Sequence, residues 1–259
     1  MHSVVISLLN HKGGTAKTSS TVNIGAALAR EGKTVLLVDL DVQANLTHWL
    51  CGDLSEGSLS IAEAVLDKSV KLGSVIRDTP TKNLFVAPAG ETMVDLELKL
   101  HSAYGREFLL KRALSQVLSK FDYILLDNPP SIGLTTVNAL VASDYFLVPV
   151  SAEYLPLIGV KKLLGTIEQI KPLNEKLRNL GYLLTMVDRR EGIGGDVEKI
   201  LRDTFKDEVL QTVVRINTKI KALPQQRKTV FDIEGSSGKS FADFENIKNE
   251  LVKRVTDGA

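Results

Sequence analysis

The chain contains 259 residues, of which 44% are hydrophobic and 24% are charged, and its formal net charge is +1. This length accommodates one large α/β domain, and the nearly neutral charge excludes a general attraction to nucleic acid, which would need a local basic patch. Cys51 is the one cysteine, so an intrachain disulfide is excluded, and no apolar run approaches the ~20 residues of a membrane span. No signal-peptide pattern precedes the first predicted strand, so we expect a cytoplasmic protein.

The first predicted elements are a strand, a glycine-containing loop and a helix. Residues 4–9 are apolar and rich in β-branched side chains, which is typical of a buried strand. In the loop, backbone N–H groups and the helix N-terminus can bind phosphate, Lys17 can neutralise its β and γ oxygens, and Thr18 can ligate Mg²⁺. The alternative is a Gly-Gly turn that merely closes a βα unit. The candidate nucleotide-binding residues of the loop are Lys12, Gly13, Gly14, Thr15, Ala16, Lys17, Thr18 and Ser19.

The helix after this loop is predicted over residues 17–31, ending before Gly32, and a second strand over residues 34–38. Asp39 and Asp41 follow that strand, at the ligand edge of an open α/β sheet. Because alternate side chains of an extended chain share one side, both carboxylates can point at a single Mg-phosphate centre. The alternative is an acidic turn that has no chemical role.

Residues 46–100 carry little functional signal. Residues 61–66 predict a short helix, residues 84–88 predict a strand, and the amphipathic residues 107–118 predict another helix. Trp49 and Cys51 in this region are interpreted as packing residues rather than as chemical groups.

A second diagnostic element lies about a hundred residues after the loop. Residues 122–127 form an apolar strand that ends in Asp127, which is the pattern of a Walker B strand whose carboxylate holds Mg²⁺. The Asn128-Pro129-Pro130-Ser131 stretch that follows cannot continue a ladder, because neither proline donates a hydrogen bond. A stiff loop at this place is suited to sensing the γ-phosphate.

The C-terminal part predicts a strand over residues 145–150, a helix over 157–171, a strand over 181–187 and a last helix over 240–255. Residues 209–231 contain no acidic side chain, which is the kind of local charge that binds a phosphate backbone without reading bases. A solvated basic face is the alternative. The apolar stripe of the last helix has ordinary core spacing, although a membrane-surface helix is conceivable. The basic residues of the acid-free segment are Arg215, Lys219, Lys221, Arg227 and Lys228.

The loop Lys12-Gly13-Gly14-Thr15-Ala16-Lys17-Thr18 resembles the K-G-G-x-x-K-[ST] motif of the deviant Walker A family, which includes the ParA/Soj partition ATPases and the MinD division-site ATPases. Residues 39–45 are similar to the D-x-D-P-Q-G-N segment of the ParA/Soj branch, with Val42 and Ala44 replacing its proline and glycine. Residues 127–130 resemble its D-x-P-P motif. Ala16 replaces a usual glycine, and its methyl group requires a negative φ.

The resemblance implies a role for each matching residue. Lys12 would reach across an ATP-bridged homodimer to the partner's phosphates, Asp41 would orient the attacking water, and Asp39 would support the Mg²⁺ shell held by Thr18 and Asp127. Asn217 lies near the adenine-contacting loop of the family. Relatives in this branch bind DNA without sequence preference through C-terminal basic residues, which here correspond to Arg190 and Lys219, with Arg189, Arg215 and Lys221 included on charge alone.

The expected fold is a single α/β domain over residues 1–259, a mostly parallel sheet with helices on both faces and no separate N-terminal DNA-reading domain. The implied function is slow Mg-dependent ATP hydrolysis that releases an ATP dimer from the nucleoid and segregates a plasmid, chromosome or other cargo with a stimulating ParB-like partner. A MinD-like membrane ATPase would require the last helix to bind lipid. A metabolic ligase-type synthetase on the same scaffold would require a small-molecule pocket. No membrane partner is expected.

Overall fold

The computed structural model describes the chain except for residues 1–2, 153–155, 189–191 and 259. Its centre is a seven-stranded sheet with the strand order β3-β4-β2-β5-β1-β6-β7, in which all neighbours are parallel except β3 and β4. The expected fold class is therefore confirmed. The strands are β1 (Val4–Leu8), β2 (Val35–Asp39), β3 (Arg77–Asp78), β4 (Leu84–Ala87), β5 (Tyr123–Asp127), β6 (Tyr145–Ser151) and β7 (Arg178–Thr185).

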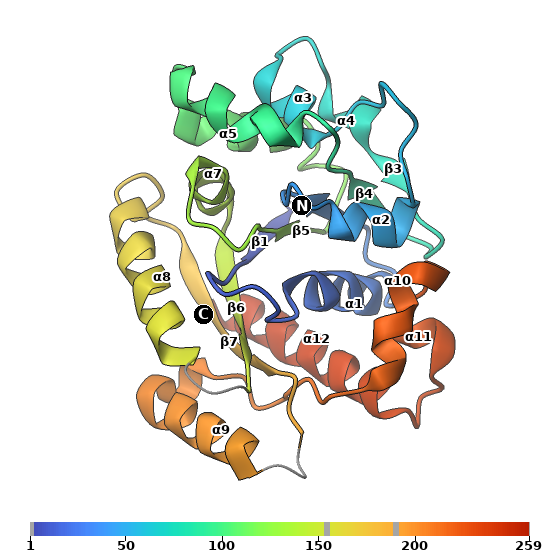
Figure 1. Cartoon of the computed structure of the whole chain (residues 1–259), viewed down its shortest axis with the longest axis vertical. Helices are drawn as coiled ribbons and strands as arrows, with labels where there is room; N and C mark the ends of the chain where they lie inside the picture. The colour runs from blue at the N-terminus through green and yellow to red at the C-terminus, as the bar shows by residue number, and fades with distance from the viewer. Residues whose placement is uncertain (1–2, 153–155, 189–191, 259) are drawn as a thin grey trace.

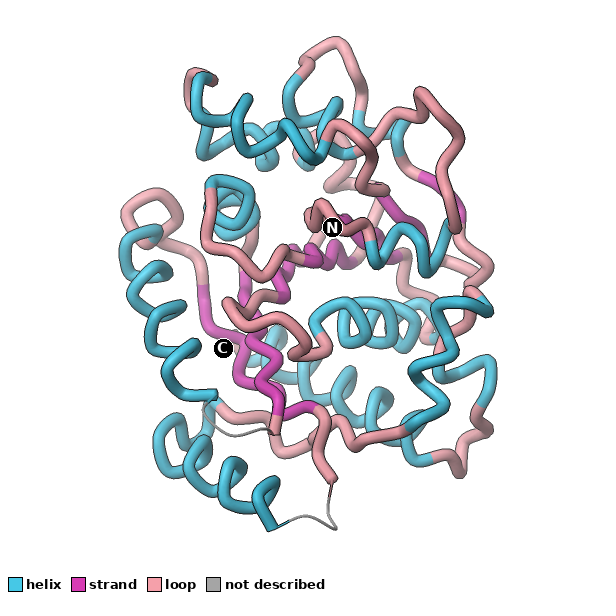
Figure 2. The backbone as a smooth tube through the Cα atoms, in the orientation of Figure 1, coloured by secondary structure: helices cyan, strands magenta, loops and turns pink. Residues whose placement is uncertain are grey.

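Helices cover both faces of this sheet (Figures 1 and 2). The α-helices of the first half are α1 (Lys17–Arg30), α2 (Asn45–Cys51), α3 (Ile61–Leu66), α4 (Leu72–Val75), α5 (Met93–Ser102) and α6 (Leu109–Leu114). Those of the second half are α7 (Leu134–Ala142), α8 (Pro156–Ile170), α9 (Gly192–Phe205), α10 (Leu223–Gln226), α11 (Val230–Ile233) and α12 (Lys239–Asp257). Short 3₁₀ helices are η1 (Arg106–Phe108), η2 (Lys206–Glu208) and η3 (Thr218–Ala222).

The alternation of apolar side chains along the strands separates the core into layers. In β1, Ile6 and Leu8 pack into a cluster with α1, α2 and α12, whereas Val5 packs into a second cluster with α3 to α6. A third cluster joins β6 and β7 to α8 and α9. Because both faces of each central strand are covered, the strand sequences are continuous apolar runs, as expected for a buried parallel sheet.

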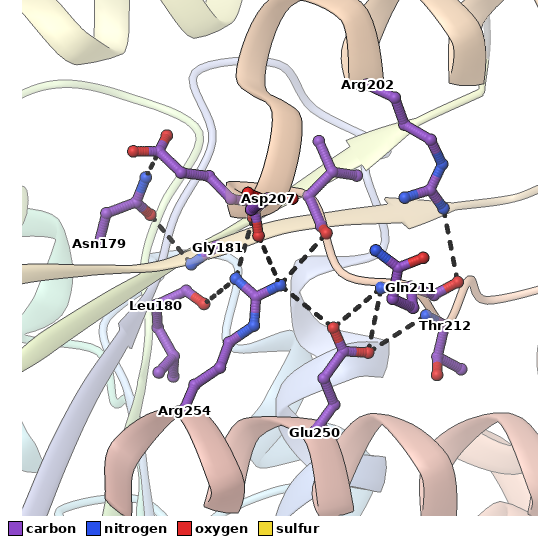
Figure 3. Close-up of polar contacts among 11 residues, drawn as sticks. Asn179, Leu180, Gly181, Arg202, Asp207, Gln211, Thr212, Glu250 and Arg254 are labelled. Carbon is purple, nitrogen blue, oxygen red and sulfur yellow. Dashed lines mark hydrogen bonds and ion pairs between the residues drawn. The ribbon is translucent and has the colours of Figure 1, made fainter. Parts of the chain in front are cut away.

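The C-terminal helix fastens the β7 edge of the sheet through Arg254 (Figure 3). The Arg254 guanidinium donates to the carbonyl oxygens of Leu180, Asp207, Glu208 and Val209 at 2.9–3.2 Å. On the same helix, Glu250 accepts hydrogen bonds from the backbone of Gln211 and Thr212. These contacts position the segment after η2, which leads to the basic stretch.

Two predicted elements differ from the structure by more than two residues at one end. The helix expected over residues 107–118 is the 3₁₀ helix η1 followed by the short α6, after which the backbone N–H groups of Gln116 and Val117 donate to carbonyl oxygens three residues earlier, in turns rather than in a continued α-helix. The last strand begins at Arg178 rather than at Gly181, which lies at a register shift with φ 139°. The helices α2, α4, α5, α7, α9, α10 and α11 and the strand β3 were not predicted.

Candidate nucleotide-binding site

The loop between β1 and α1 is fastened to the strands β6 and β7 by buried polar groups. Asn10 donates to the carbonyl oxygen of Pro149 at 2.7 Å and accepts from the backbone N–H of Lys12 at 3.0 Å. Thr15 accepts, at its carbonyl oxygen, a hydrogen bond of 3.1 Å from the hydroxyl of Thr185 at the end of β7. The loop therefore has one fixed shape at the carboxyl ends of β1, β6 and β7.

The outer side of the loop is open toward solvent. Lys12, Gly13 and Gly14 are exposed, and a Cβ atom added at either glycine would meet nothing within 4 Å. Ala16 is the residue before α1 and its side chain cannot cap the helix, so the first-turn N–H groups have no side-chain acceptor there. This combination of open backbone and an uncapped helix N-terminus is suited to binding an anion.

The expectation of a negative φ at Ala16 is wrong. The structure places Ala16 at φ 59° and ψ 30°, in the left-handed region that favours glycine. Ala44, the other alanine that replaces a family glycine, has φ 51°. The loops therefore keep the backbone shape that glycine would adopt, and the two methyl groups add strain of about 1 kcal/mol each.

Lys17, the first residue of α1, is turned inward. Its side chain is buried, with 7% of the residue exposed, and Nζ lies 3.5 Å from the carbonyl oxygen of Lys12. Burial lowers the pKa of Lys17, and the nearby carboxylates of Asp127 and Asp41 oppose that shift. A buried ammonium group at the base of an open loop is the expected counter-charge for a bound phosphate.

Thr18 and Asp127 meet although they are 109 positions apart in the sequence. The hydroxyl of Thr18 donates to Asp127 Oδ2 at 2.7 Å, and the hydroxyl of Thr21 donates to Oδ1 at 3.3 Å. Burial, reinforced by the charge of Asp39, raises the pKa of Asp127 to about 7, although the Thr18 hydrogen bond and Lys17 lower it. Sequence reasoning missed Thr21, which has no motif signal apart from its position one turn after Lys17.

Asp39 lies beside Asp127, because the two residues are register partners in the adjacent strands β2 and β5. Its carboxylate accepts from the backbone N–H of Asp41 at 3.1 Å and from both the backbone and the hydroxyl of Thr47 at 2.8 and 2.7 Å. Burial raises the pKa of Asp39 to about 6. The structure thus directs Asp39 toward α2, where it fixes the turn that presents Asp41.

Asp41 occupies the ligand edge next to Lys17. It is 8% exposed, and its Oδ1 accepts from the backbone N–H of Gln43 at 3.0 Å. The negative charge of Asp41 raises the pKa of Lys17 and so opposes the lowering by burial. Thr47 was missed by sequence reasoning, since a lone threonine inside a short helix gives no signal of contact with Asp39.

The proline-containing loop after β5 starts from a buried amide. Asn128 is 1% exposed, and its Nδ2 donates to the carbonyl oxygens of Leu8 and Leu126 at 3.1 and 3.2 Å. Among the residues that the structure describes, its Oδ1 has no hydrogen-bond partner. The side chain therefore joins the ends of β1 and β5, and its Oδ1 can accept a hydrogen bond from a ligand or a water molecule.

The donor set fits a magnesium ion that arrives with a nucleotide. Within the described part of the chain, no three His, Cys, Asp or Glu side chains are grouped closely enough to hold a metal ion unaided. Magnesium in phosphotransfer sites commonly takes only one or two protein oxygens and completes its shell with phosphate oxygens and water. The Thr18 hydroxyl and the buried Asp127 carboxylate supply such oxygens.

A cavity of about 940 Å³ lies beyond the end of β7, next to the strand whose Thr185 holds the phosphate loop. Asn217 lines it, but its side chain already makes internal hydrogen bonds: Nδ2 donates to Glu234 and Ser240 at 2.7 Å, and Oδ1 accepts from the backbone N–H of Lys219. Asn217 thus shapes the cavity wall. Glu234 and Ser240 were not predicted, because no local motif marks them.

The predicted DNA-binding residues fall into three groups. Lys219 and Lys221 are exposed on η3. Arg215 is held by Asp243, with 2.5 Å between Arg215 Nη2 and Asp243 Oδ1, so its charge is compensated within the fold. Arg189 and Arg190 lie outside the described residues.

The last helix packs into the core. Phe244, Ile247 and Leu251 of α12 are buried in the cluster that contains α1, and the two helices are in contact. The described part of the chain contains no helix that has the length and apolar character to cross a membrane. The preference for core packing over a lipid-binding surface is therefore consistent with the structure.

Comparisons with known proteins identify close relatives. Residues 3–179 match the family described as "AAA domain". The chain is 39% identical to the sporulation initiation inhibitor protein Soj of Bacillus subtilis over 87% of this chain and 89% of that protein. It is 35% identical to the chromosome partitioning protein ParA of Myxococcus xanthus, over 97% and 89% of the two chains.

A solved structure is also similar over nearly the whole chain. It is that of cobyrinic acid a,c-diamide synthase from Mycobacterium smegmatis with bound ADP and magnesium, which has 31% sequence identity and a TM-score of 0.86 and covers 99% of this chain and 97% of that one. The three sequence motifs, the arrangement of Lys17, Thr18 and Asp127, and these relatives agree. The chain belongs to the ParA/Soj family of partition ATPases.

Proposed function

We propose that the site binds ATP with Mg²⁺ and hydrolyses the γ-phosphate, and that the chain uses this cycle as a partition switch. The observation that carries the proposal is the convergence of Lys17, Thr18 and Asp127 at one sheet edge beneath an open, glycine-containing loop. A buried ammonium, a hydroxyl and a carboxylate at this place complement a triphosphate with its metal ion.

Each group has a separate task in this proposal. Lys17 and the N–H groups of residues 13–19 bind the phosphates, while Thr18 and Asp127 would hold the ion, which would supply positive charge to the phosphate oxygens. Asp41 orients water for attack on the γ-phosphorus. Asp39, through Thr47 and the Asp41 backbone, keeps that carboxylate in place.

The central test is the substitution Asp41→Ala. We expect ATP binding and ATP-dependent dimers to persist while turnover is lost, because the phosphate-binding groups remain. The measurements are nucleotide binding by fluorescence, molar mass by light scattering and phosphate release. Asp53→Ala, an exposed aspartate in the segment after α2, is the control. Unchanged phosphate release in Asp41→Ala would remove Asp41 from the mechanism.

ATP-dependent dimerisation is assigned to Lys12. This residue lies on the exposed part of the loop, unlike the buried Lys17, and is therefore placed to reach a second molecule. We expect Lys12→Ala to bind ATP but to stay monomeric with ATP and Mg²⁺, whereas Lys33→Ala, an exposed lysine after α1, should dimerise normally. An ATP dimer of normal stability in Lys12→Ala would contradict this assignment.

Non-specific DNA binding by the ATP dimer is assigned to Lys219 and Lys221, whose side chains are exposed on η3. Charge reversal at both positions should weaken binding to duplex DNA of any sequence and flatten its salt dependence. The same reversal at Lys68 and Lys71, between α3 and α4, is the matched control. An equal loss of DNA affinity in both double variants would show that net charge, and not the position of Lys219 and Lys221, determines binding.

In the full cycle, the ATP dimer is associated with the nucleoid in the cytoplasm, and a ParB-like partner stimulates hydrolysis. Hydrolysis releases the subunits from DNA, and its rate sets when the cargo moves. Turnover is expected to be slow without that partner. Basal phosphate release that rises when DNA and a ParB-like protein are added would support the cycle.

A metabolic role is the second candidate, because the similar solved structure is that of a diamide synthase. The two functions are separated by substrate dependence. A synthetase would release phosphate only with an amide-forming carboxylic acid and an ammonia donor, whereas a partition switch would respond to DNA. Turnover that depends on such an acid would replace the partition proposal.

A further inference from the structure

Glu97 connects α5 to the first turn of α7, which lies 37 positions later in the sequence. Its Oε1 accepts from the backbone N–H of Leu134 at 2.6 Å, and its Oε2 accepts from the backbone N–H and the hydroxyl of Thr135 at 3.1 and 2.9 Å. The residue before this helix is Gly133, which has no side chain to act as a cap. Glu97 therefore takes the place of the missing N-cap and opposes the positive end of the helix dipole.

The helix that Glu97 caps is the one that ends the proline-containing loop. That loop leaves β5 at Asp127, whose carboxylate is held by Thr18, and enters α7 at Leu134. A hydrogen bond of 2.7 Å from the Thr136 hydroxyl to the carbonyl oxygen of Ser131 fixes its last residues. Both ends of the loop are thus attached to fixed points, one at the proposed metal site and the other at Glu97.

The contact between Glu97 and this loop is close. A Cβ atom at Gly133 would lie 2.4 Å from Glu97 Oε1 and 2.8 Å from its Cδ, so glycine is needed for the carboxylate to reach the helix. Among the described residues no Lys or Arg forms an ion pair with Glu97. Within the described residues, the hydrogen bonds of this carboxylate all come from α7, so an ion pair does not account for its position.

We propose that Glu97 is a positioning residue for ATP hydrolysis, which sets the place of the Asn128-Pro129-Pro130 loop relative to the γ-phosphate. Two consecutive prolines restrict the backbone after Asn128, and the hydrogen bond from the Thr136 hydroxyl to the carbonyl oxygen of Ser131 spans the residues between the prolines and α7. A shift at the Glu97 end is therefore transmitted toward Asn128. The inference rests on the proposed function, because it takes this loop to face the γ-phosphate. Glu97 acts through α7, whose first turn donates the hydrogen bonds to its carboxylate.

The test compares two capping glutamates. Glu63 is the matched control, because it also accepts hydrogen bonds from a helix N-terminus, that of α3, and from the hydroxyls of Ser60 and Thr92. Glu97→Ala, Glu97→Gln and Glu63→Gln are assayed for phosphate release over a range of ATP concentrations. Rates are normalised to the folded fraction measured by circular dichroism, and hydrogen exchange is followed over residues 128–140.

We expect Glu97→Ala to lower kcat about tenfold with KM within about twofold, since small displacements of a catalytic loop reduce the rate more than binding. Glu97→Gln, which retains one acceptor, should show a smaller loss and keeps the test decisive if Glu97→Ala does not fold. Glu63→Gln should lower the thermal midpoint but leave kcat unchanged. Faster exchange over residues 128–136 should accompany the loss in the Glu97 variants alone.

Normalised kcat within twofold of wild type in Glu97→Ala and Glu97→Gln would overturn the inference, and so would an equal loss in Glu63→Gln, which would indicate general softening. The failure of the proposed function is distinguishable from both outcomes. In that case the wild-type chain itself would release no phosphate from ATP with Mg²⁺.

Discussion

Asp127 is a buried carboxylate whose charge destabilises the nucleotide-free fold, and the substitution Asp127→Asn measures that effect. The native pKa is raised from 3.8 to about 7, so between these pH values the folded state binds more protons than the unfolded state. Stability from this group is therefore present at low pH and is lost as pH rises toward 7. The difference between a pKa of 3.8 in the unfolded chain and about 7 in the fold lowers the free energy of unfolding by about 4 kcal/mol above pH 7.

The asparagine side chain fits the same contacts. Its Oδ1 can accept from the Thr18 hydroxyl, and its Nδ2 can donate to the hydroxyl oxygen of Thr21. The Thr21 proton, which in the native protein can go to Asp127, then goes to the carbonyl oxygen of Lys17, 3.1 Å away. The variant thus removes the titration and retains the hydrogen bonds. Asp39 titrates in both proteins, so most of its contribution cancels from the comparison.

The assay is urea unfolding in EDTA without nucleotide, at pH 5 and pH 8. We expect Asp127→Asn to be more stable than wild type at pH 8, with an advantage that exceeds the one at pH 5 by about 3 kcal/mol. Asp95→Asn, an exposed carboxylate on α5, should show no such pH dependence. An advantage that is the same at both pH values, or a loss of stability at pH 8, would refute the reasoning.

Three further predictions concern stability and are checked by thermal or urea unfolding of the nucleotide-free chain. Ala16→Gly and Ala44→Gly should each stabilise the fold by about 1 kcal/mol, because glycine adopts a positive φ without strain. Ala27→Gly inside α1 is the control and should destabilise the fold by about as much. Equal losses of stability in all three variants would show that Ala16 and Ala44 are not strained. Gly181→Ala should cost at least about 2 kcal/mol, because its Cβ would lie 2.7 Å from a carbonyl oxygen at φ 139°, and a neutral effect would show that β7 can shift. Arg254→Met should cost about 3 kcal/mol by leaving four carbonyl oxygens without their donor (Figure 3), and full recovery by Arg254→Lys would argue that charge alone matters.

The sequence alone was sufficient to predict the elements whose residues follow a simple local pattern. Buried parallel strands appear as apolar runs, and the phosphate loop has its own motif, so β1, β2, β5 and β6 were predicted within a residue or two. α5 was missed because its inward Met93, Leu96 and Leu100 alternate with Val94 and Leu98, which are 71% and 73% exposed. Apolar residues on both sides of a helix obscure the period that would identify it.

The site shows the same division between local and long-range information. Lys17, Thr18 and Asp127 follow from motifs, but the contacts of Thr47 with Asp39 and of Glu97 with α7 join segments that no pattern connects. Arg215, predicted to bind DNA on its charge alone, forms an ion pair with Asp243, 28 positions later, and no local pattern marks that contact. Charge in a sequence does not reveal its partner.

The order of the central strands has a consequence for synthesis. β1 carries the phosphate loop, but both of its neighbours, β5 and β6, come much later: Val4 pairs with Tyr123 and Ile6 pairs with Tyr145. A nascent chain that has left the ribosome only as far as β4 contains Lys17 and Thr18 without Asp127 or the carbonyl of Pro149 that anchors the loop. The chain can therefore bind nucleotide only late in synthesis, after β5 and β6 have been made. Until then its apolar first strand is unpaired and prone to aggregation.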